Sequence, residues 1–396
     1  MEKRAGKGYR SVYSMLTAVI FLSVVFGVFA LNLFETYSNW KDSDDYGLRA
    51  AISDLESVDR IVYPFVNLNG AFQNVMQRNY IYDADPANDT VKKSDGYIVG
   101  NSDSFSEKDV KKAAEQLSGT SEWLASMGIP LVYVQAPSKM TGSPEPAMPG
   151  LENHTYAKHE LFREEALSRG IDYLEGAELL SYKGDEAFYI TDHHWTTEAC
   201  LEVSDSVCAY LRDRYGLSVN EEAMGKDAYE HVTNRKAFLG AEGRRTGRWY
   251  AGLDDFTVIS PKFDTDFDIE ISDKDGALSE RHGSFEEAVM DKSKDTKNYS
   301  FEDSAYYAYW GGDYGLIHVK NNKAAGRSRV LVIKDSYGVP VTAFMTNAFA
   351  EMYIADIRYY AAEKSLRKIV EESRPDAVVY IYGNGYLTKS KMFAVK

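Results

Sequence analysis

A chain of 396 residues that is 44% hydrophobic and 13% aromatic carries enough apolar side chains for a sizeable core, which excludes a wholly disordered protein. The formal net charge of −15 argues against a protein that holds nucleic acid by bulk electrostatic attraction, so no nucleic-acid partner is predicted. The length suits one large or two ordinary domains.

The N-terminal segment differs from the rest of the chain. Basic residues within residues 1–11 precede an uncharged apolar run over residues 12–34, and Glu35 follows. At about 1.5 Å per helical residue, this run is long enough to cross a hydrocarbon core of about 30 Å. The charge pattern predicts a single-pass anchor in the cell membrane, with residues 1–11 cytoplasmic and the remainder extracytoplasmic. A cleaved signal peptide is the alternative, but its apolar region would be shorter.

The next part of the chain leads into the folded domain. Residues 35–85 are polar and aromatic and are predicted to form a stalk, followed by a domain over residues 86–396. A short strand is predicted at residues 97–99. The spacing of apolar residues predicts a helix over residues 106–127, with Ser106 as its N-cap.

An alternation of strands and helices then predicts the fold. Residues 129–137 form a nearly continuous apolar run, which is typical of a parallel strand covered on both faces. A helix over residues 157–168 and a strand over residues 171–174 continue the alternation. The pattern indicates an α/β fold with a parallel sheet sandwiched by helices, whose ligand site lies beyond the carboxyl ends of the strands.

Residues 216–328 interrupt this rhythm. The segment is rich in glycine and charged residues and contains an alternating run over residues 263–271, so a β-rich insertion is predicted. Residues 264–275 begin like a calcium loop, but Ile269 and Asp275 occupy the positions of the glycine and glutamate that such a loop needs. We therefore interpret this run as a half-exposed strand.

The α/β pattern returns near the C-terminus. Strands are predicted at residues 330–333, 352–356 and 377–381, with helices over residues 339–349 and 365–373 between them.

The sequence Asp192-His193-His194-Trp195 stands where an apolar run gives way to a helical pattern. A histidine titrates near neutral pH, and a preceding carboxylate can fix its tautomer, so the motif suits a general base. Metal ligation is the competing interpretation. Because adjacent histidines on an extended segment point to opposite sides and no further cluster offers ligands, no metal is predicted.

Two cysteines follow this motif. Cys200 and Cys208 fall on one predicted helix, roughly 12 Å apart, which is beyond disulfide reach. They are predicted to be buried apolar fillers.

Ser336 is the best nucleophile in the sequence. It follows the apolar strand at residues 330–333 and stands at the start of a helix, where free backbone N–H groups can stabilise an oxyanion. A serine hydroxyl needs a base to remove its proton, and an Asp-oriented histidine supplies one in any chain order. The alternative role for Ser336 is an ordinary helix cap.

These motifs resemble a known family. Asp192-His193-His194-Trp195 looks like the signature of the DHHW family. Together with segments 137–139, 334–336 and 354–358, it resembles the SGNH-hydrolase-like domain of the alginate O-acetyltransferase family over roughly residues 90–396. The resemblance implies an SGNH-hydrolase-like fold in which Asp192 orients His194, His194 is the base and Ser336 carries the acyl group.

The resemblance also suggests residues that bind substrate. Arg358 matches a family arginine near the substrate, and Asn384 stands where the family has an oxyanion donor, although Asn-Gly is also a turn signal. Lys139 is predicted either to bind an anionic group or to hold its loop. Where SGNH enzymes have a glycine before the Asp-Ser pair, this chain has Lys334.

Aromatic residues near these motifs have two interpretations. Trp195 is either a ring packed under the site or a platform for a sugar. Tyr306, Tyr307 and Trp310 form an aromatic loop that either stacks on sugar rings or covers the core.

The predicted function is that of an O-acetyltransferase that moves an acetyl group through acyl-Ser336 onto a cell-surface or secreted polysaccharide, without a cofactor. The resemblance implies a membrane-bound O-acyltransferase partner that supplies the acetyl group. A carbohydrate acetylesterase with the same triad and a non-catalytic glycan-binding subunit of a polysaccharide export complex are the alternatives.

Overall fold

The computed structural model describes residues 62–395 except 84, 102–103, 182–183, 274, 295–303 and 361–365, together with short pieces between residues 15 and 30. Its strands are β1 (Tyr80–Ile81), β2 (Thr90–Lys92), β3 (Ile98–Gly100), β4 (Leu131–Gln135), β5 (Asp172–Glu175), β6 (Tyr229–Phe238), β7 (Asp254–Pro261), β8 (Phe267–Ser272), β9 (Leu278–Gly283), β10 (Leu316–Asn321), β11 (Arg329–Lys334), β12 (Glu351–Ala355) and β13 (Ala377–Tyr382). Its helices are α4 (Tyr63–Val75), α5 (Glu107–Ala125), α6 (His154–Ser168), α7 (Thr197–Tyr215), α8 (Ala241–Thr246), α9 (Arg248–Ala251), α10 (Gly338–Met345) and α11 (Leu366–Ser373).

The predicted membrane anchor is not supported. Among the residues that the structure describes, no helix combines the length with the apolar composition needed to cross a membrane. Much of the predicted anchor at residues 12–34, all of residues 1–11 and the first part of the predicted stalk lie outside the described residues. The single-pass anchor, and the cell-membrane location that depended on it, are therefore withdrawn.

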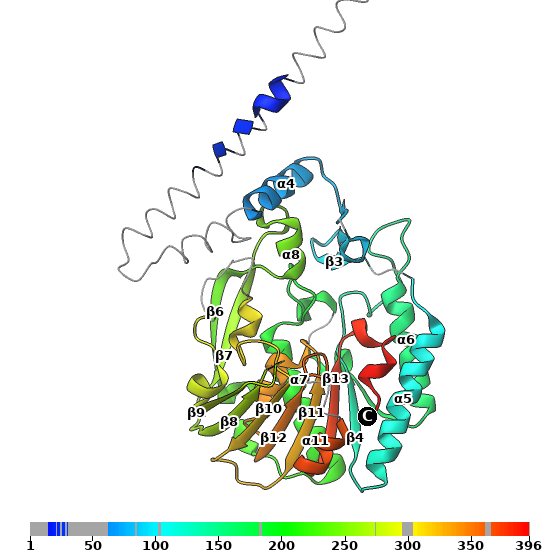
Figure 1. The fold of residues 1–396 in the computed structure, drawn as a ribbon, viewed down its shortest axis with the longest axis vertical. Helices are drawn as coiled ribbons and strands as arrows, with labels where there is room; N and C mark the ends of the chain where they lie inside the picture. The colour runs from blue at the N-terminus through cyan, green and yellow to red at the C-terminus, as the bar shows by residue number, and fades with distance from the viewer. Residues whose placement is uncertain are drawn as a thin grey trace, which may run out of the picture.

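The fold is a mixed α/β fold built on an eight-stranded sheet with the order β5-β4-β13-β11-β12-β10-β8-β9. The strands from β5 to β12 are parallel, as predicted. The strands β10, β8 and β9 extend the sheet with antiparallel pairing, so the prediction of a purely parallel sheet was wrong. Figure 1 shows this sheet, with β9 at one side and β4 near α5 and α6 at the other.

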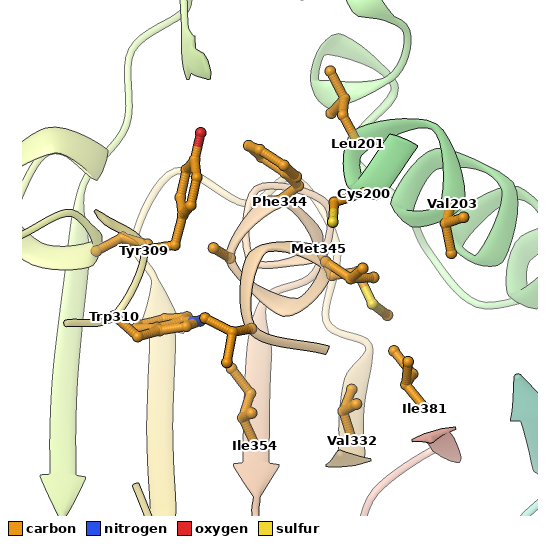
Figure 2. Close-up of a cluster of buried hydrophobic side chains, with 14 of the residues drawn as sticks. Cys200, Leu201, Val203, Tyr309, Trp310, Val332, Phe344, Met345, Ile354 and Ile381 are labelled. Atoms are coloured by element: carbon orange, nitrogen blue, oxygen red, sulfur yellow. The ribbon is translucent and has the colours of Figure 1, made fainter. Parts of the chain in front are cut away.

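Helices cover both faces of the parallel part of the sheet, because its strands alternate two sets of apolar side chains. Val132 and Val332 point into one core with α7 and α10. Tyr133 and Leu331 point into a second core with α5, α6 and α11. Figure 2 shows the first core, where side chains of α7 and α10 meet those of β11, β12 and β13. The free thiols of Cys200 and Cys208 are buried in this core.

The segment predicted as a β-rich insertion divides into two parts. Strands β6 and β7 form a separate antiparallel pair, whereas β8, β9 and β10 join the main sheet. In β8 the apolar residues Ile269 and Ile271 are buried, while Asp268 and Glu270 are exposed, as expected for a half-exposed strand. Along the chain, α8 lies between β6 and β7, and it contacts the loop that carries Asp192.

The helix α4 docks onto this region. Asn67 Oδ1 accepts a hydrogen bond of 2.8 Å from the backbone N–H of Arg248, and Gly70 lies against the carbonyl oxygen of Thr246. Figure 1 shows α4 directly beside α8, on the side of α8 away from the sheet.

Candidate active site

Asp192, His194 and Ser336 form an unbroken chain of hydrogen-bonding groups. His194 Nδ1 lies 2.6 Å from Asp192 Oδ1, and His194 Nε2 lies 2.9 Å from Ser336 Oγ. The histidine and the aspartate belong to the loop before α7, and the serine lies between β11 and α10. The structure thus brings the Asp192–His194 pair together with the distant Ser336, in the order carboxylate, imidazole, hydroxyl.

Backbone hydrogen bonds hold the Asp192 carboxylate in place. Its Oδ1 accepts from the N–H of His194 at 2.9 Å, and its Oδ2 accepts from the N–H of Ala241 at 2.7 Å. The preceding residues are held by Asp254, whose carboxylate accepts from the N–H groups of Ile190 and Thr191. The carboxylate therefore cannot turn away from His194 without breaking several hydrogen bonds.

Lys139 holds the same loop from its other side. Its buried ammonium donates to the carbonyl oxygens of Ile98, Tyr189 and Ile190 at 2.5, 2.9 and 3.1 Å. An ammonium group has three N–H donors, and these three carbonyls use all of them. Of the two predicted roles for Lys139, this geometry supports the one that stabilises the loop.

Aromatic rings surround His194. The ring of Tyr306 stacks on the imidazole with centroids 4.2 Å apart, and the ring of Tyr337 lies 4.9 Å away. The Tyr306 hydroxyl donates to the carbonyl oxygen of Tyr337 at 3.2 Å. The imidazole is therefore held between the Asp192 hydrogen bond and these rings, which restricts it to one orientation.

The electrostatic surroundings favour a carboxylate beside a neutral imidazole. Burial raises the pKa of Asp192, but the neighbouring imidazoles of His194 and His193 and the hydrogen bonds from His194 outweigh it and hold that pKa well below its ordinary value. Burial and the nearby His193 lower the pKa of His194, although Asp192 opposes this. At neutral pH, His194 is thus a neutral ring whose Nε2 can accept a proton.

His193 faces a different partner. Its Nδ1 lies 3.3 Å from Oε1 of the buried Glu242, and its side chain is 41% exposed. Partial burial lowers the pKa of His193, but Glu242 and Asp192 raise it to about 9. The second imidazole of the motif is therefore a cation at neutral pH, next to the neutral His194.

A cleft of about 430 Å³ opens onto the half-buried Ser336. Arg358 and Asn384 also line it, together with His193 and Glu242. Within the described part of the chain, the backbone N–H of Ser336 and Nδ2 of Asn384 have no hydrogen-bond acceptor. Asn384 Nδ2 is buried, and both residues line the same cleft as the hydroxyl. Unpaired donors beside the hydroxyl are what an oxyanion site requires.

Asp335 connects the two loops that carry these donors. Its buried carboxylate accepts from the N–H of Gly383 at 2.8 Å and from the N–H of Tyr337 at 2.9 Å. Burial raises the pKa of Asp335 to about 6, against the opposing effect of these hydrogen bonds. The loop that carries Asn384 is thus tied to the turn that carries Ser336.

A buried ion network holds Arg358. Its guanidinium contacts Asp356 at 2.5 Å and Asp313 at 3.1 Å, and Lys334 Nζ lies 2.6 Å from Asp313. Lys334, which replaces the glycine of the SGNH pattern, therefore balances the charge of two buried carboxylates. Arg358 also donates to the Tyr386 hydroxyl at 3.2 Å.

The two tryptophans do not form a sugar platform. Trp195 and Trp310 are fully buried, and their indole N–H groups donate to the carbonyl oxygen of Tyr337 and to Thr342 Oγ1. Because neither ring has exposed surface, the predicted substrate-binding role is wrong for both residues in this conformation. Both pack in the hydrophobic core, which was the alternative interpretation.

The motif also has the composition of a metal site. Asp192, His193 and His194 each offer one ligand atom, all within 4.8 Å of one another. Two ligands of one tetrahedral zinc ion lie roughly 3.3 Å apart when the bonds are about 2.0 Å long. The 2.6 Å contact between Asp192 and His194 is shorter, and Ser336 engages the other nitrogen of His194. The geometry is that of a hydrogen-bonded chain.

Sequence reasoning missed two acidic residues and one histidine of this site. Glu242 pairs with His193, while His159 and Glu175 lie behind Asn384. None belongs to a recognisable motif, and each comes from a different element of the chain. Their only signal in the sequence is that each is a charged or titratable residue beside an apolar segment. That pattern is too common to identify a site.

Gly240 packs tightly against Asp192, and this contact leads to a testable prediction. A Cβ atom at Gly240 would lie 2.2 Å from Asp192 Cβ, so Gly240→Ala must displace the loop. We expect the free energy of unfolding to fall by about 1–3 kcal/mol in denaturant titrations. Since Asp192 raises the pKa of His194, NMR titration should show a further fall of that pKa. Gly119→Ala, in α5 with open space around it, is the control: it should leave the pKa of His194 intact and should raise the free energy of unfolding by about 0.5–1 kcal/mol.

Comparison with known proteins agrees with the resemblance predicted from the sequence. Residues 97–243 match the family model described as SGNH hydrolase-like domain, acetyltransferase AlgX. This segment contains Asp192 and His194 but ends before Ser336. No curated protein matches the chain.

Two solved structures that are 17% identical to this chain share the fold. Bacillus cereus PatB1 with a sulfonyl adduct aligns with a TM-score of 0.63 and 17% identity, covering 77% of this chain and 99% of PatB1. A DHHW family protein from Eubacterium siraeum aligns with a TM-score of 0.59 and 17% identity, covering 80% of this chain and 98% of that chain. The O-acetyltransferase domain of Pseudomonas putida AlgJ is 11% identical, covers 76% of this chain and 92% of its own, and aligns with a TM-score of 0.43.

Proposed function

We propose that the protein is a serine-dependent O-acetyltransferase that transfers an acetyl group to a hydroxyl of a polysaccharide. The observation that carries the proposal is the continuous chain from Asp192 through His194 to the half-buried Ser336 at the cleft. The match of residues 97–243 to a family described as an acetyltransferase supports the choice of an acetyl group.

In the first half-reaction, Ser336 Oγ attacks the carbonyl carbon of an acetyl ester. His194 Nε2 takes the hydroxyl proton as the new Oγ–C bond forms, and Asp192 stabilises the resulting imidazolium. The tetrahedral intermediate then loses the alcohol of the donor, which receives its proton from His194. The product of this step is acetyl-Ser336 with a neutral His194.

The oxygen of the tetrahedral intermediate needs hydrogen-bond donors. The backbone N–H of Ser336 and the buried Nδ2 of Asn384 have no acceptor among the described residues, and both residues line this cleft. Such donors accelerate acyl transfer because they are already oriented before the negative charge develops. Asn384 is therefore proposed as an oxyanion donor, as the resemblance implied.

In the second half-reaction, a hydroxyl of the acceptor attacks the acetyl carbon of acetyl-Ser336. His194 removes the proton from that hydroxyl, the C–Oγ bond breaks, and the proton returns to Ser336. Arg358 lines the cleft in a fixed orientation and is proposed to contact the acceptor. The membrane-bound O-acyltransferase that would supply the acetyl group stays a prediction.

Labelling with an activated ester tests the acyl-serine step. After incubation with 4-nitrophenyl acetate, mass spectrometry should find an added acetyl group on the peptide that contains Ser336. Ser336→Ala should lose both the label and the release of nitrophenolate. Ser118→Ala, which removes an exposed hydroxyl on α5, should retain both. An unlabelled Ser336 peptide in the native chain, or equal turnover by Ser336→Ala, would remove the mechanism.

The acceptor distinguishes the proposal from its alternatives. Addition of an oligosaccharide acceptor should increase the turnover of acetyl-Ser336 and yield an acetylated sugar. Turnover that ignores the acceptor and yields only acetate would identify an esterase. Glycan binding without any ester turnover would identify a non-catalytic subunit.

A further inference from the structure

His159 is a buried histidine that the proposed chemistry leaves without a task. It lies in α6 with 3% of its surface exposed, and its two ring nitrogens contact side chains from two other parts of the chain. Nε2 lies 2.8 Å from Glu175 Oε2 at the end of β5, and Nδ1 lies 3.3 Å from Asn384 Oδ1 after β13. The histidine thus connects a carboxylate to the proposed oxyanion donor.

The atoms that face His159 determine where its hydrogens lie. The amide oxygen of Asn384 can only accept, so Nδ1 must donate. Nε2 faces a carboxylate, which requires either a hydrogen on Nε2 or a protonated Glu175. In both forms the pair of Glu175 and His159 retains one proton between its members and presents Nδ1–H to Asn384.

This arrangement sets the orientation of the Asn384 amide. Because the amide oxygen is engaged by His159, the amide nitrogen is left without a partner among the described residues, at a residue that lines the cleft. Without a hydrogen on Nδ1, the ring would instead accept from the amide nitrogen. The amide would then turn its oxygen toward the cleft, where it would repel a developing oxyanion.

We propose that Glu175 and His159 are positioning residues that keep the Asn384 amide turned with its N–H groups toward the cleft. This inference rests on the proposed function, because it assigns the two residues a role in the same acyl transfer. Neither residue touches the reacting atoms, so both act through Asn384.

The surroundings of the pair add two groups. Glu160 of α6 lies 3.9 Å from His159 Nε2, and the Tyr173 hydroxyl donates to Glu175 Oε2 at 3.3 Å.

A mutant cycle on acetyl-ester turnover tests the proposal. Asn384→Ala should lower kcat by about 10²–10³-fold, the loss for one oxyanion donor. His159→Leu should lower kcat with little change in KM, and His159→Leu/Asn384→Ala should be no slower than Asn384→Ala alone. His159→Gln, whose amide can donate to Asn384, should recover part of the loss.

Matched controls separate positioning from folding. His318→Leu removes a histidine of β10 that lies away from the cleft and pairs with Glu351 at 2.7 Å. This variant should leave kcat unchanged. Unfolding temperatures are measured for every variant, and His159→Gln serves as the test if His159→Leu does not fold. A kcat of the native level in both His159 variants, or an equal further loss in the Asn384→Ala background, would overturn the proposal.

The same set of variants distinguishes this failure from failure of the proposed function. If Ser336→Ala retains turnover, acyl transfer through Ser336 is wrong, and the role of Asn384 as an oxyanion donor falls with it. If Ser336→Ala is inactive and His159 variants behave like the native chain, only the positioning role is wrong.

Discussion

Replacing His194 by alanine is expected to lower ester turnover by about 10⁴–10⁶-fold, the loss found when the base of a serine triad is removed. Nε2 lies 2.9 Å from Ser336 Oγ, and no other ring nitrogen is hydrogen-bonded to this hydroxyl in the described part of the chain. The measurement is initial-rate kinetics with an acetyl ester, accompanied by an unfolding curve. His282→Ala, which removes a largely exposed ring paired with Asp268, is the control and should retain the native rate.

The aspartate behind the ring should behave as part of the same unit. Asp192→Asn is expected to lower ester turnover by about 10⁴-fold, because an amide neither fixes the tautomer of His194 nor stabilises its imidazolium. The double variant of Asp192 and His194 should be little slower than His194→Ala, since residues that act as a unit do not contribute additively. Losses that multiply in the double variant would contradict a shared role.

The pH profile gives an independent check on this base. Burial and His193 lower the pKa of His194 below its ordinary 6.5. Only the neutral ring can accept the serine proton, so the rate should fall as the pH drops through that lowered pKa. At pH 7 protonation of His194 should no longer limit the rate. Since Asp192 raises the pKa of His194, Asp192→Asn should move this acid limb to still lower pH. An acid limb above pH 7 would contradict the assignment.

Replacing Lys334 by methionine is expected to destabilise the fold by about 3–5 kcal/mol, the cost of leaving a buried charge without its partner. Lys334 is 1% exposed, and its ammonium lies 2.6 Å from Asp313 and 3.4 Å from Asp356. Two carboxylates would then face Arg358 alone in a buried setting. The free energy of unfolding is measured by chemical denaturation.

A charge-matched variant isolates this cause. Lys334→Met/Asp313→Asn removes one charge of each sign and should recover part of the lost stability. Lys292→Met breaks an exposed pair with Glu286 and should cost only about 0–1 kcal/mol. A loss from Lys334→Met as small as that from Lys292→Met would show that the buried network does not stabilise the fold.

Local patterns in the sequence were sufficient to identify residues that lie at the ends of strands and helices. The Asp192 loop was recognisable because polar residues stand between an apolar run and a helix, and Ser336 because it follows a buried strand. In the structure, Thr196 caps α7, and Ser336 lies between β11 and α10, one residue before the N-cap Tyr337. The periodicity of two also identified β8, although not its place in the sheet.

Contacts between distant segments could not be predicted in this way. His159, Glu175 and Asn384 come from α6, β5 and the loop after β13, and no local pattern relates them. Lys334 was visible only as a departure from a motif, because its partner Asp313 lies in another segment. The burial of Trp195 and Trp310 likewise depends on which segments pack above them.

The sequence alone determined the alternation of strands and helices and the positions of a candidate base and a candidate nucleophile, because periodicity and end signals act over a few residues. The tertiary structure alone decided that β8, β9 and β10 extend the parallel sheet, since strand pairing joins residues that are distant in the chain. It also decided that His194 Nε2 meets Ser336 Oγ at 2.9 Å, because that distance depends on how two separate loops are held at one edge of the sheet.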